Sequence, residues 1–349
     1  MSAVLPEPAV RFVLPRAAEA PAPPEARGLS RDGVRLLVAR PDGVTHRRFS
    51  DLPDLLCPGD LLVVNTSATL PAAVEGRLRG RSRPVHVAGR LDDGSWAVEV
   101  RLPDASGPDL DVAAGDQVVL PDGLVLRLVV PWPDPSAGRS RLWRAAPSQR
   151  VEPAAYLAAH GRPVAYAYLS GRYPLRDYQT VFADEPGSAE MASAGRPFTA
   201  ELVLRLAVRG IAVAPVVLHA GVSSPELHEP PLPERFRVLA STAALVNATG
   251  AAGGRVVAVG TTVTRALESA AAPDGAVRAA SGWTDLVLGP HRPARVVTGL
   301  VSGLHAPEAS HLLLLEAVAD AALVRQAYDA ALSGGYLWHE FGDASLFLP

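Results

Sequence analysis

The stretch that decides the fold is Gly253-Gly254-Arg255-Val256-Val257-Ala258-Val259-Gly260-Thr261-Thr262-Val263-Thr264-Arg265. Its apolar run, residues 256–259, is typical of a strand that is buried on both faces. The glycine and threonines that follow are typical of a tight turn into a helix. Strand, turn and helix in this order form one unit of an α/β fold.

Helices and strands alternate on both sides of this unit. Thr199 is expected to cap a helix over residues 199–209, which Gly210 ends. Residues 211–219 predict a strand, and residues 309–328 predict helix in one or two pieces. Such alternation predicts a mostly parallel sheet, either open or closed into a barrel.

Residues 72–150 have a different pattern. Short apolar runs recur there at intervals of roughly ten residues, between turn signals such as Asp92-Asp93-Gly94 and Pro121-Asp122-Gly123. This spacing predicts a small antiparallel β-domain that resembles a barrel. We therefore expect an inserted β-rich domain at 72–151, between a first part of the α/β domain at 1–71 and its remainder at 152–349.

The composition bounds the chemistry. The 349 residues are 48% hydrophobic and 20% charged, which is enough to build a core and excludes disorder of the whole chain. All 33 basic residues are arginine, so no lysine can hold a phosphate, form a Schiff base or act as a general base. The net charge of −3 argues against binding of nucleic acid or an anionic membrane through the overall charge of the protein. A local basic patch stays an alternative.

Redox and targeting signals are few. The single cysteine, Cys57, cannot form an internal disulfide or a thiolate zinc cluster, and is expected to be a small buried hydrophobe. No basic region followed by an apolar run opens the chain, and the apolar run at 312–318 is interrupted by Glu316. We expect a cytoplasmic protein without a membrane span.

The first candidate site is the turn Gly260-Thr261-Thr262. The carboxyl end of a strand and the N-terminus of the following helix form a crevice with free N–H donors in α/β folds. Those donors suit a carboxylate, a phosphate or a ribose hydroxyl. The alternative is an ordinary strand-to-helix turn, because the glycine fingerprint of dinucleotide sites is absent.

Two histidines follow predicted strands and are candidates for proton transfer. His219 closes the strand at 211–219, and His305 follows Ser302-Gly303-Leu304 before a long helix. The alternative for each is an imidazole that only ties its loop by a hydrogen bond. No histidine pair has metal-ligand spacing, so we expect no metal site. The remaining histidines considered, which are expected to be solvated surface residues, are His160, His228, His291, His311 and His339.

The densest basic stretch is Arg77-x-Arg79-x-Arg81-x-Arg83. On one extended strand, alternate positions would put four guanidinium groups on the same face. That face is either a solvated strand surface or a stripe that contacts phosphates.

Several segments match one known family in its own order, over residues 30–347. They include Pro58-Gly59-Asp60-Leu61-Leu62-Val63-Val64-Asn65, Asp177-Tyr178-Gln179-Thr180-Val181-Phe182-Ala183, Pro186-Gly187-Ser188, residues 256–269 and Phe341-Gly342-Asp343-Ala344. The chain resembles the S-adenosylmethionine:tRNA ribosyltransferase-isomerases of queuosine biosynthesis.

The resemblance implies a fold, a reaction and a set of site residues. The fold would be a distorted α/β barrel with an inserted β-domain. The reaction would transfer the ribosyl part of S-adenosylmethionine, used as a substrate, to the aminomethyl group of a 7-deazaguanine at the wobble position of tRNA. Adenine and methionine would leave, the sugar would rearrange to an epoxycyclopentanediol, and no metal would take part. The implied residues are His305, as the main group for proton transfer, and His219; Asn65, Gly195, Gly260, Thr261, Thr262 and Arg265 for S-adenosylmethionine; and Tyr178, Gln179, Glu234 and Asp343 for the acceptor.

The chain also departs from the family motifs. The family's Asn-Asp-Thr-Arg-Val-Ile-Pro-Ala-Arg is Asn65-Thr66-Ser67-Ala68-Thr69-Leu70-Pro71-Ala72-Ala73 here, without the aspartate and both arginines. The histidines of its His-x-Met-His-x-Glu motif fall at Glu229 and Leu232, and only Glu234 remains. These changes predict a divergent paralog. The alternatives are a small nucleoside or another amine in place of tRNA, and a non-catalytic binding module; the sequence does not give the oligomeric state.

Overall fold

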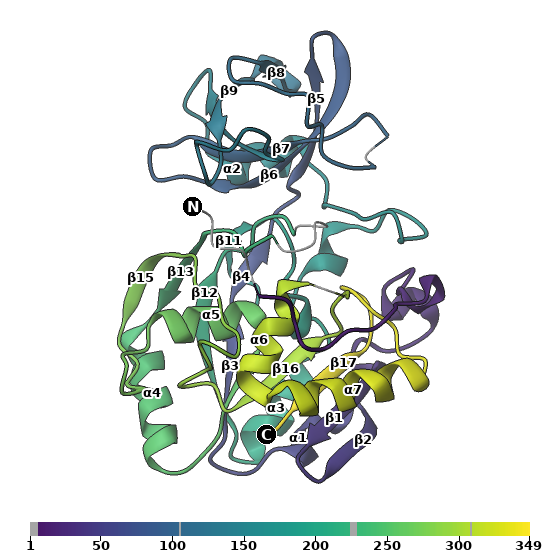
Figure 1. Cartoon of the computed structure of the whole chain (residues 1–349), viewed down its shortest axis with the longest axis vertical. Coiled ribbons are helices and arrows are strands. Elements are labelled where there is room, and N and C mark those ends of the chain that lie inside the picture. The colour runs from purple at the N-terminus through teal and green to yellow at the C-terminus, as the bar shows by residue number, and fades with distance from the viewer. Residues whose placement is uncertain (1–5, 105, 224–228, 308) are drawn as a thin grey trace.

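The computed structural model describes residues 6–104, 106–223, 229–307 and 309–349. Figure 1 shows helices around a large sheet and a smaller group of strands above them. The chain enters the smaller part after β4 (Ser67–Thr69) and has returned to the larger part by β11 (Glu185–Ser188). β4 and β11 pair with each other between the two parts.

The large sheet has nine strands, and the four at its centre are parallel. In spatial order these are β12 (Ala212–Leu218), β3 (Leu61–Asn65), β14 (Val256–Val259) and β16 (Gly299–Gly303). Antiparallel strands β13 (Glu234–Val238) and β15 (Ala280–Thr284) extend the sheet beyond β12. Beyond β16 lie β17 (Ala344–Phe347), β1 (Arg35–Arg40) and β2 (Gly43–Arg48).

The α/β class is confirmed, but the predicted distorted α/β barrel is not. Within the described parts of the chain, the nine strands pair in one series that ends at β15 and β2, and these two strands do not pair with each other. An α/β barrel needs parallel strands that alternate with helices around the whole circle. Here the alternation stops at the antiparallel strands β13, β15 and β2, so the sheet is open and mixed.

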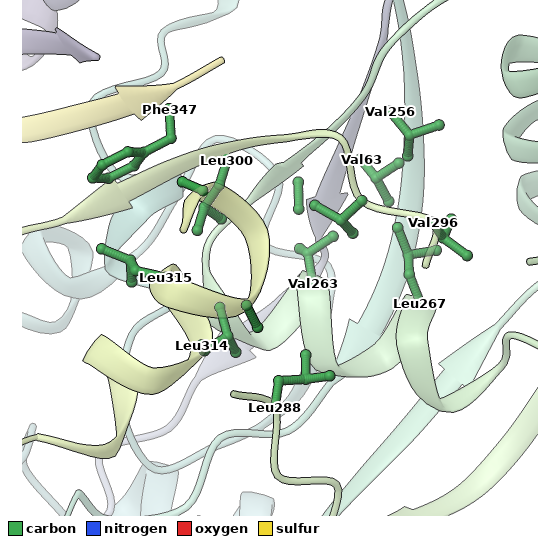
Figure 2. Packing of buried hydrophobic residues seen from close by; sticks show 14 of the residues in the cluster. Val63, Val256, Val263, Leu267, Leu288, Val296, Leu300, Leu314, Leu315 and Phe347 are labelled. Carbon is green, nitrogen blue, oxygen red and sulfur yellow. The ribbon is translucent and has the colours of Figure 1, made fainter. Parts of the chain in front are cut away.

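Two apolar layers cover the sheet. On β3, Leu61 and Val63 point into one layer, whereas Leu62 and Val64 point into the other, as the alternation of a strand requires. Burial on both faces explains why residues 256–259 are apolar without interruption. Figure 2 shows the first layer, with Val63, Val256, Val263, Leu267, Leu288, Val296, Leu300, Leu314, Leu315 and Phe347.

Helices supply the other half of each layer. α4 (Ala240–Ala251), α5 (Thr261–Ser269), α6 (Ser310–Ala319) and α7 (Ala321–Ser333) contribute to the first layer. α1 (Leu52–Leu55) and α3 (Ala200–Val208) contribute to the second. The predicted N-cap is confirmed, because the Leu202 amide donates to Thr199 Oγ1 at 3.1 Å. The helical stretch near the C-terminus is in two pieces, which break at Asp320 with a φ of 53°.

The predicted barrel-like β-domain is confirmed as a closed barrel of six antiparallel strands. Its interior is apolar and includes Val74, Val85, Trp96 and Leu126. The following helix α2 (Pro153–His160) adds Tyr156 and Leu157 to this core. The strands are β5 (Ala73–Leu78), β6 (Arg81–Arg90), β7 (Trp96–Val100), β8 (Gln117–Val119), β9 (Val125–Pro131) and β10 (Leu142–Pro147).

The arginine stripe expected on one extended strand is wrong. β5 ends at Leu78, and the chain reverses through Arg79 and Gly80, whose φ angles are 53° and 77°. Because of this hairpin, the side chain of Arg77 lies on the opposite face of the ribbon from Arg81 and Arg83. The ion pairs Arg79–Asp116 and Arg83–Asp109 further tie two of the guanidinium groups to carboxylates.

The two connections between barrel and sheet lie against each other. The amides and carbonyls of Ala73 and Arg162 exchange two hydrogen bonds, at 2.9 and 2.8 Å. Gly161 packs on the carbonyl of Pro71, where a Cβ would lie only 1.9 Å from the oxygen. The outgoing and returning chains therefore form a short paired segment.

A second contact joins the barrel to the edge of the sheet. Asp92, in the turn between β6 and β7, accepts hydrogen bonds from Arg235 of β13 at 2.6 Å and from the indole of Trp283 of β15 at 2.8 Å. The barrel is thus held at the paired connection and at this edge.

Cys57 is exposed, so the prediction of a buried residue is wrong. It lies in the turn that leads from α1 into β3, and its amide donates to a carboxylate oxygen of Asp60 at 2.8 Å. Cys57 contributes its backbone amide to the turn, and its thiol lies at the surface.

Candidate functional site

The candidate site lies where the parallel strands of the sheet end. The carboxyl ends of β3, β12, β14 and β16 share one edge, and β3 runs from this edge through Asn65 and Thr66 into β4. Figure 1 shows β4 and β11 between this edge and the barrel. Ligands of open α/β sheets bind at such carboxyl ends.

Asn65, at the end of β3, is fully hydrogen-bonded within the protein. Its carbonyl oxygen accepts from the amides of Ser67 and Leu218, both at 3.0 Å. Its amide nitrogen donates to Leu218 O at 2.8 Å and to Thr262 Oγ1 at 3.3 Å. These bonds join β3, β12 and α5, so Asn65 positions Thr262 and has no donor or acceptor left over.

The glycine turn has the conformation that the motif predicts. Gly260 adopts a φ of +97°, and its amide donates to Val301 O at 2.8 Å. A Cβ there would lie 3.3 Å from Ala194, in the short helical turn η7 (Ser193–Gly195). α5 begins at Thr261, and the first amides of a helix have no partner within it. The structure therefore brings together Asn65, Gly195 and the turn Gly260-Thr261-Thr262.

His219 follows β12 and lies between two serines and a carboxylate. Its Nδ1 is 2.7 Å from Ser67 Oγ, which is 2.6 Å from Ser188 Oγ. Its Nε2 is 3.5 Å from a carboxylate oxygen of Glu185. β4, β11 and the end of β12 thus place a serine, a glutamate and a histidine in one chain of contacts.

One arrangement of these hydrogen bonds gives every hydroxyl hydrogen an acceptor. The Ala220 amide donates to Ser188 Oγ at 3.0 Å. Ser188 then donates to Ser67, and Ser67 donates to Nδ1 of His219, so that Nε2 carries the ring hydrogen and faces Glu185. Burial lowers the pKa of His219, against the opposing effect of Glu185, so the ring is neutral near pH 7. A neutral imidazole can accept a proton.

Gly187 allows His219 to sit where it does. A Cβ at this position would lie 2.3 Å from Nδ1 of the His219 ring. The glycine of Pro186-Gly187-Ser188 therefore has a steric reason: the β11 backbone passes directly over the imidazole.

His305 lies further along the same edge, in a more enclosed position. Its Nε2 is 2.8 Å from Ser302 Oγ, and its ring stacks on His311 with centroids 4.5 Å apart and planes at 7°. Tyr328 accepts a hydrogen bond from the His305 amide at 3.1 Å, and the Trp338 indole donates to its carbonyl at 2.9 Å. Burial and the neighbouring imidazoles hold the pKa of His305 well below its usual value.

Two of the histidines expected to be solvated are not at the open surface. His311 lies against His305, and His339 stacks on Tyr168 with centroids 4.6 Å apart. The helix start and the loop that hold them fold inward, which a single sequence does not reveal. His160 is partly buried and faces Asp122, His291 lies in an exposed turn, and His228 lies outside the described residues.

The stacked pair makes stability depend on pH. Burial lowers the pKa of His311 to about 4, so between about pH 6.5 and 4 the unfolded chain binds a proton that the folded chain does not. Stability is therefore expected to fall as the pH falls through this window. His311→Gln should reduce the loss between pH 7 and 5 by about 1–2 kcal/mol, measured by urea unfolding. His291→Gln should behave as the parent; equal losses in all three proteins would contradict the assignment.

Arg265 and Glu234 bind each other. The guanidinium forms an ion pair with the Glu234 carboxylate, and it donates to the carbonyls of Leu286 at 3.2 Å, Leu232 at 3.1 Å and Thr284 at 3.0 Å. Burial raises the pKa of Glu234, and Arg265 opposes that rise. The pair joins α5 to the loop before β13 and to the residues after β15.

The other residues expected to bind the acceptor substrate differ in how many of their hydrogen-bonding groups are already used. Gln179 exchanges hydrogen bonds with the backbone of Thr69, at 2.9 and 2.8 Å. Asp343 accepts from Arg35 and from the Leu337 amide. Tyr178 is buried, and its hydroxyl has no hydrogen-bond partner among the residues that the structure describes. The Tyr178 hydroxyl therefore keeps its full hydrogen-bonding capacity.

Sequence reasoning did not single out Ser67, Ser188, Glu185 or Gly187 as site residues. Pro186-Gly187-Ser188 was noted only as a family match, although a glycine followed by a serine next to a strand end was the available signal. The contact of Ser67 with His219 joins positions 152 residues apart, which no local pattern encodes.

The fold and the site together define a class of protein. It is an α/β protein with an inserted β-barrel, and its open sheet ends in a glycine turn and in a serine–histidine–glutamate array suited to proton transfer. The chain belongs to the family described as queuosine biosynthesis protein, whose model matches residues 9–347.

The chain is also similar in sequence and in structure to individual proteins whose names indicate the same function. The chain is 38% identical over 334 residues to the S-adenosylmethionine:tRNA ribosyltransferase-isomerase of Acidiphilium cryptum, covering 90% of this chain and 92% of the relative. It is 35% identical over 339 residues to that of Symbiobacterium thermophilum, covering 91% and 94%. The crystal structure of the S-adenosylmethionine tRNA ribosyltransferase from Thermotoga maritima is similar, with a TM-score of 0.53, 29% identity and coverage of 97% and 99%.

Two further features of the described residues concern the requirements of a membrane-spanning helix and of a metal site. No helix in residues 6–104, 106–223, 229–307 and 309–349 is long and apolar enough to cross a bilayer. In those same ranges, no three histidine, cysteine, aspartate or glutamate side chains are grouped as ligands of one metal ion would be.

Proposed function

We propose that this chain transfers the ribosyl part of S-adenosylmethionine to the aminomethyl group of a 7-deazaguanine in tRNA. Adenine and methionine are released, and the sugar is rearranged to an epoxycyclopentanediol. The observation that carries the proposal is the match of the queuosine biosynthesis family over residues 9–347. A tRNA acceptor implies a cytoplasmic reaction.

We assign the proton transfers first to His219. The reaction removes a proton from the carbon next to the sulfonium and gives one to the departing adenine, so it needs a group that is neutral yet easily protonated. The contacts of His219 with Ser67 and Glu185 support this role, because the carboxylate stabilises the imidazolium that forms. His305 is the second candidate, and its enclosure by His311 and Ser302 also suits a purely structural role.

We assign the charged end of S-adenosylmethionine to the start of α5. The amides after Gly260 point out of the helix, and a helix N-terminus favours a carboxylate by about 0.3–1 kcal/mol, or about 2 kcal/mol when partly buried. Thr261 and Thr262 add hydroxyl groups, and Gly195 lets η7 pack against Thr180. Asn65 acts through Thr262, and Arg265 through the loop that it anchors. For the acceptor we propose Tyr178, with Gln179, Glu234 and Asp343 holding the surrounding backbone.

The domain boundaries are part of the proposal. The barrel strands run from Ala73 to Pro147, which supports an inserted unit at 72–151 between α/β segments at 1–71 and 152–349.

Adenine release tests the function directly. With S-adenosylmethionine and tRNA that carries the 7-deazaguanine, the chain is expected to release adenine and methionine in equal amounts, and the tRNA should gain the rearranged sugar. Mass spectrometry of the small molecules and of the digested tRNA measures both. The matched control is the same tRNA with guanine at the wobble position, which should give no release. Release that is equally fast without tRNA, or absent with it, would refute the proposed acceptor.

A further inference from the structure

Aromatic rings and two glutamates form a cluster beside the edge that carries His305. Tyr166 and Tyr168 stack with centroids 5.8 Å apart and planes at 11°, and Tyr168 stacks on His339 with planes at 16°. The Tyr166 hydroxyl donates to Glu190, and the Tyr168 hydroxyl donates to Glu340 at 2.8 Å. We call these five residues the acid–tyrosine cluster.

The two carboxyl groups are held differently. Glu190 accepts hydrogen bonds from Tyr166 and from both the amide (2.7 Å) and the hydroxyl of Ser223. Glu340 accepts from Tyr168 through one oxygen, and its other oxygen has no hydrogen-bond partner in the part of the chain that the structure describes. Glu340 is thus the carboxyl group with capacity to spare.

Neither glutamate forms an ion pair with an arginine or a histidine within the described ranges. The charge of Arg141 acts to lower the pKa of Glu190 from a longer distance, but its guanidinium is bound to Glu99 and Glu229. Four other carboxylates of low exposure are paired with arginine, namely Asp60 with Arg255, Glu99 with Arg141, Glu234 with Arg265 and Asp343 with Arg35. Glu316 is a further buried carboxylate for which the described residues supply no arginine.

The missing cation has an electrostatic consequence. Burial, with a further contribution from Glu190, raises the pKa of Glu340 to about 8. Burial also raises the pKa of Glu190. A positive charge placed between these groups would remove the penalty of ionising them.

An independent observation at the same place is an orphaned hydroxyl. Tyr178 is 2% exposed, and its phenol oxygen is buried without a hydrogen-bond partner in the described ranges. Its ring centroid is 5.1 Å from that of Phe341, the neighbour of Glu340, and burial together with the negative charge of Glu340 raises the pKa of the hydroxyl. A buried polar group is normally paired, so this hydroxyl points to a partner that the described residues do not supply.

The backbone at this place is also unusual. His339 has a φ of +71°, a conformation that residues with a side chain rarely adopt. Its amide donates to Leu304 O at 3.4 Å, next to His305. The surrounding structure therefore holds the cluster directly against the candidate site.

We propose that the acid–tyrosine cluster, with Tyr178, binds a protonated primary amine. An ammonium group has three N–H donors, and the free oxygen of Glu340, the Tyr178 hydroxyl and the Glu190 carboxylate can accept them. Tyr168 is stacked between Tyr166 and His339, so the outer face of Tyr166 is the aromatic surface that can face a cation. The inference rests on the proposed function only in identifying this amine with the aminomethyl group of the acceptor; binding of an amine as such does not depend on it.

Calorimetry with benzylamine, and with benzyl alcohol as its uncharged counterpart, tests the site on the full chain. Benzylamine is expected to bind at least about tenfold more tightly than benzyl alcohol. Glu340→Gln keeps the shape and removes the charge, and should weaken benzylamine binding by about tenfold or more without affecting benzyl alcohol. Glu190→Gln should act in the same direction, and Tyr178→Phe should weaken binding several-fold.

The matched control is Glu316→Gln. Glu316 is also buried and has no arginine partner among the described residues, but it lies in α6 and accepts from the Val10 amide at 3.0 Å, so its replacement should leave amine binding unchanged. Equal binding of the amine and the alcohol, or unchanged binding in both folded glutamate variants, would overturn the proposal. Adenine release is measured separately: charge-dependent amine binding without tRNA-dependent release would sustain the amine site and reject the proposed function.

Discussion

Replacing His219 by alanine is expected to lower the rate of adenine release by about 10²-fold or more, the usual contribution of general acid–base catalysis. The ring contacts both Ser67 and Glu185, so its loss removes the proton acceptor, while the pairing of β4 with β11 keeps both neighbours in place. The affinity for S-adenosylmethionine should change little, because the lost interaction belongs to the transition state. Single-turnover rates and calorimetric titration of the same preparation measure the two quantities.

His305→Ala is the companion variant that separates the two histidines. If His305 only holds its loop to Ser302 and His311, the variant has a lower melting temperature, and its rate of adenine release per folded molecule is unchanged. A rate that falls by about 10²-fold in His305→Ala, with His219→Ala unaffected, would reverse the assignment and make His305 the main proton-transfer group.

Removing the guanidinium of Arg265 is expected to have the largest effect on stability. Arg265→Leu leaves the Glu234 carboxylate buried without its partner and three backbone carbonyls without their donor. Breaking a buried pair in this way costs about 3–5 kcal/mol of unfolding free energy. Urea unfolding measures the loss.

The control is Arg79→Leu, which removes a solvent-exposed pair with Asp116 and should leave the unfolding free energy nearly unchanged, because solvent screens exposed pairs. A stable Arg265→Leu variant that has lost affinity for S-adenosylmethionine would contradict the structural role, and would support direct contact with the methionine carboxylate instead.

The sequence was most informative where the signal is local. The apolar run at 256–259, the glycine after it and the N-cap at Thr199 each predict their element, because backbone geometry and burial act over a few residues. The closed barrel at 73–147 also followed from short apolar runs between turn signals. The openness of the large sheet did not, because it depends on antiparallel strands such as β15, whose partners lie far away in sequence.

The site was predictable in place but not in detail. Strand ends and the glycine turn direct attention to one edge of the sheet, and the structure places Asn65, His219 and Thr262 together at that edge. The sequence cannot show which polar side chains are already satisfied. Asn65, Gln179 and Asp343 form hydrogen bonds inside the protein, whereas the Tyr178 hydroxyl has no partner among the described residues, and no pattern in the sequence distinguishes the two cases.

The paired connection between sheet and barrel limits how this protein can vary in length. The outgoing segment at Ala73 and the returning segment at Arg162 are hydrogen-bonded to each other, and Gly161 leaves no space above Pro71. A residue inserted into one segment would shift its register against the other, and both hydrogen bonds would be lost together. Insertions are therefore expected to be tolerated at hairpin tips such as Arg79 and Gly80, where added residues extend into solvent and no paired segment has to change its length.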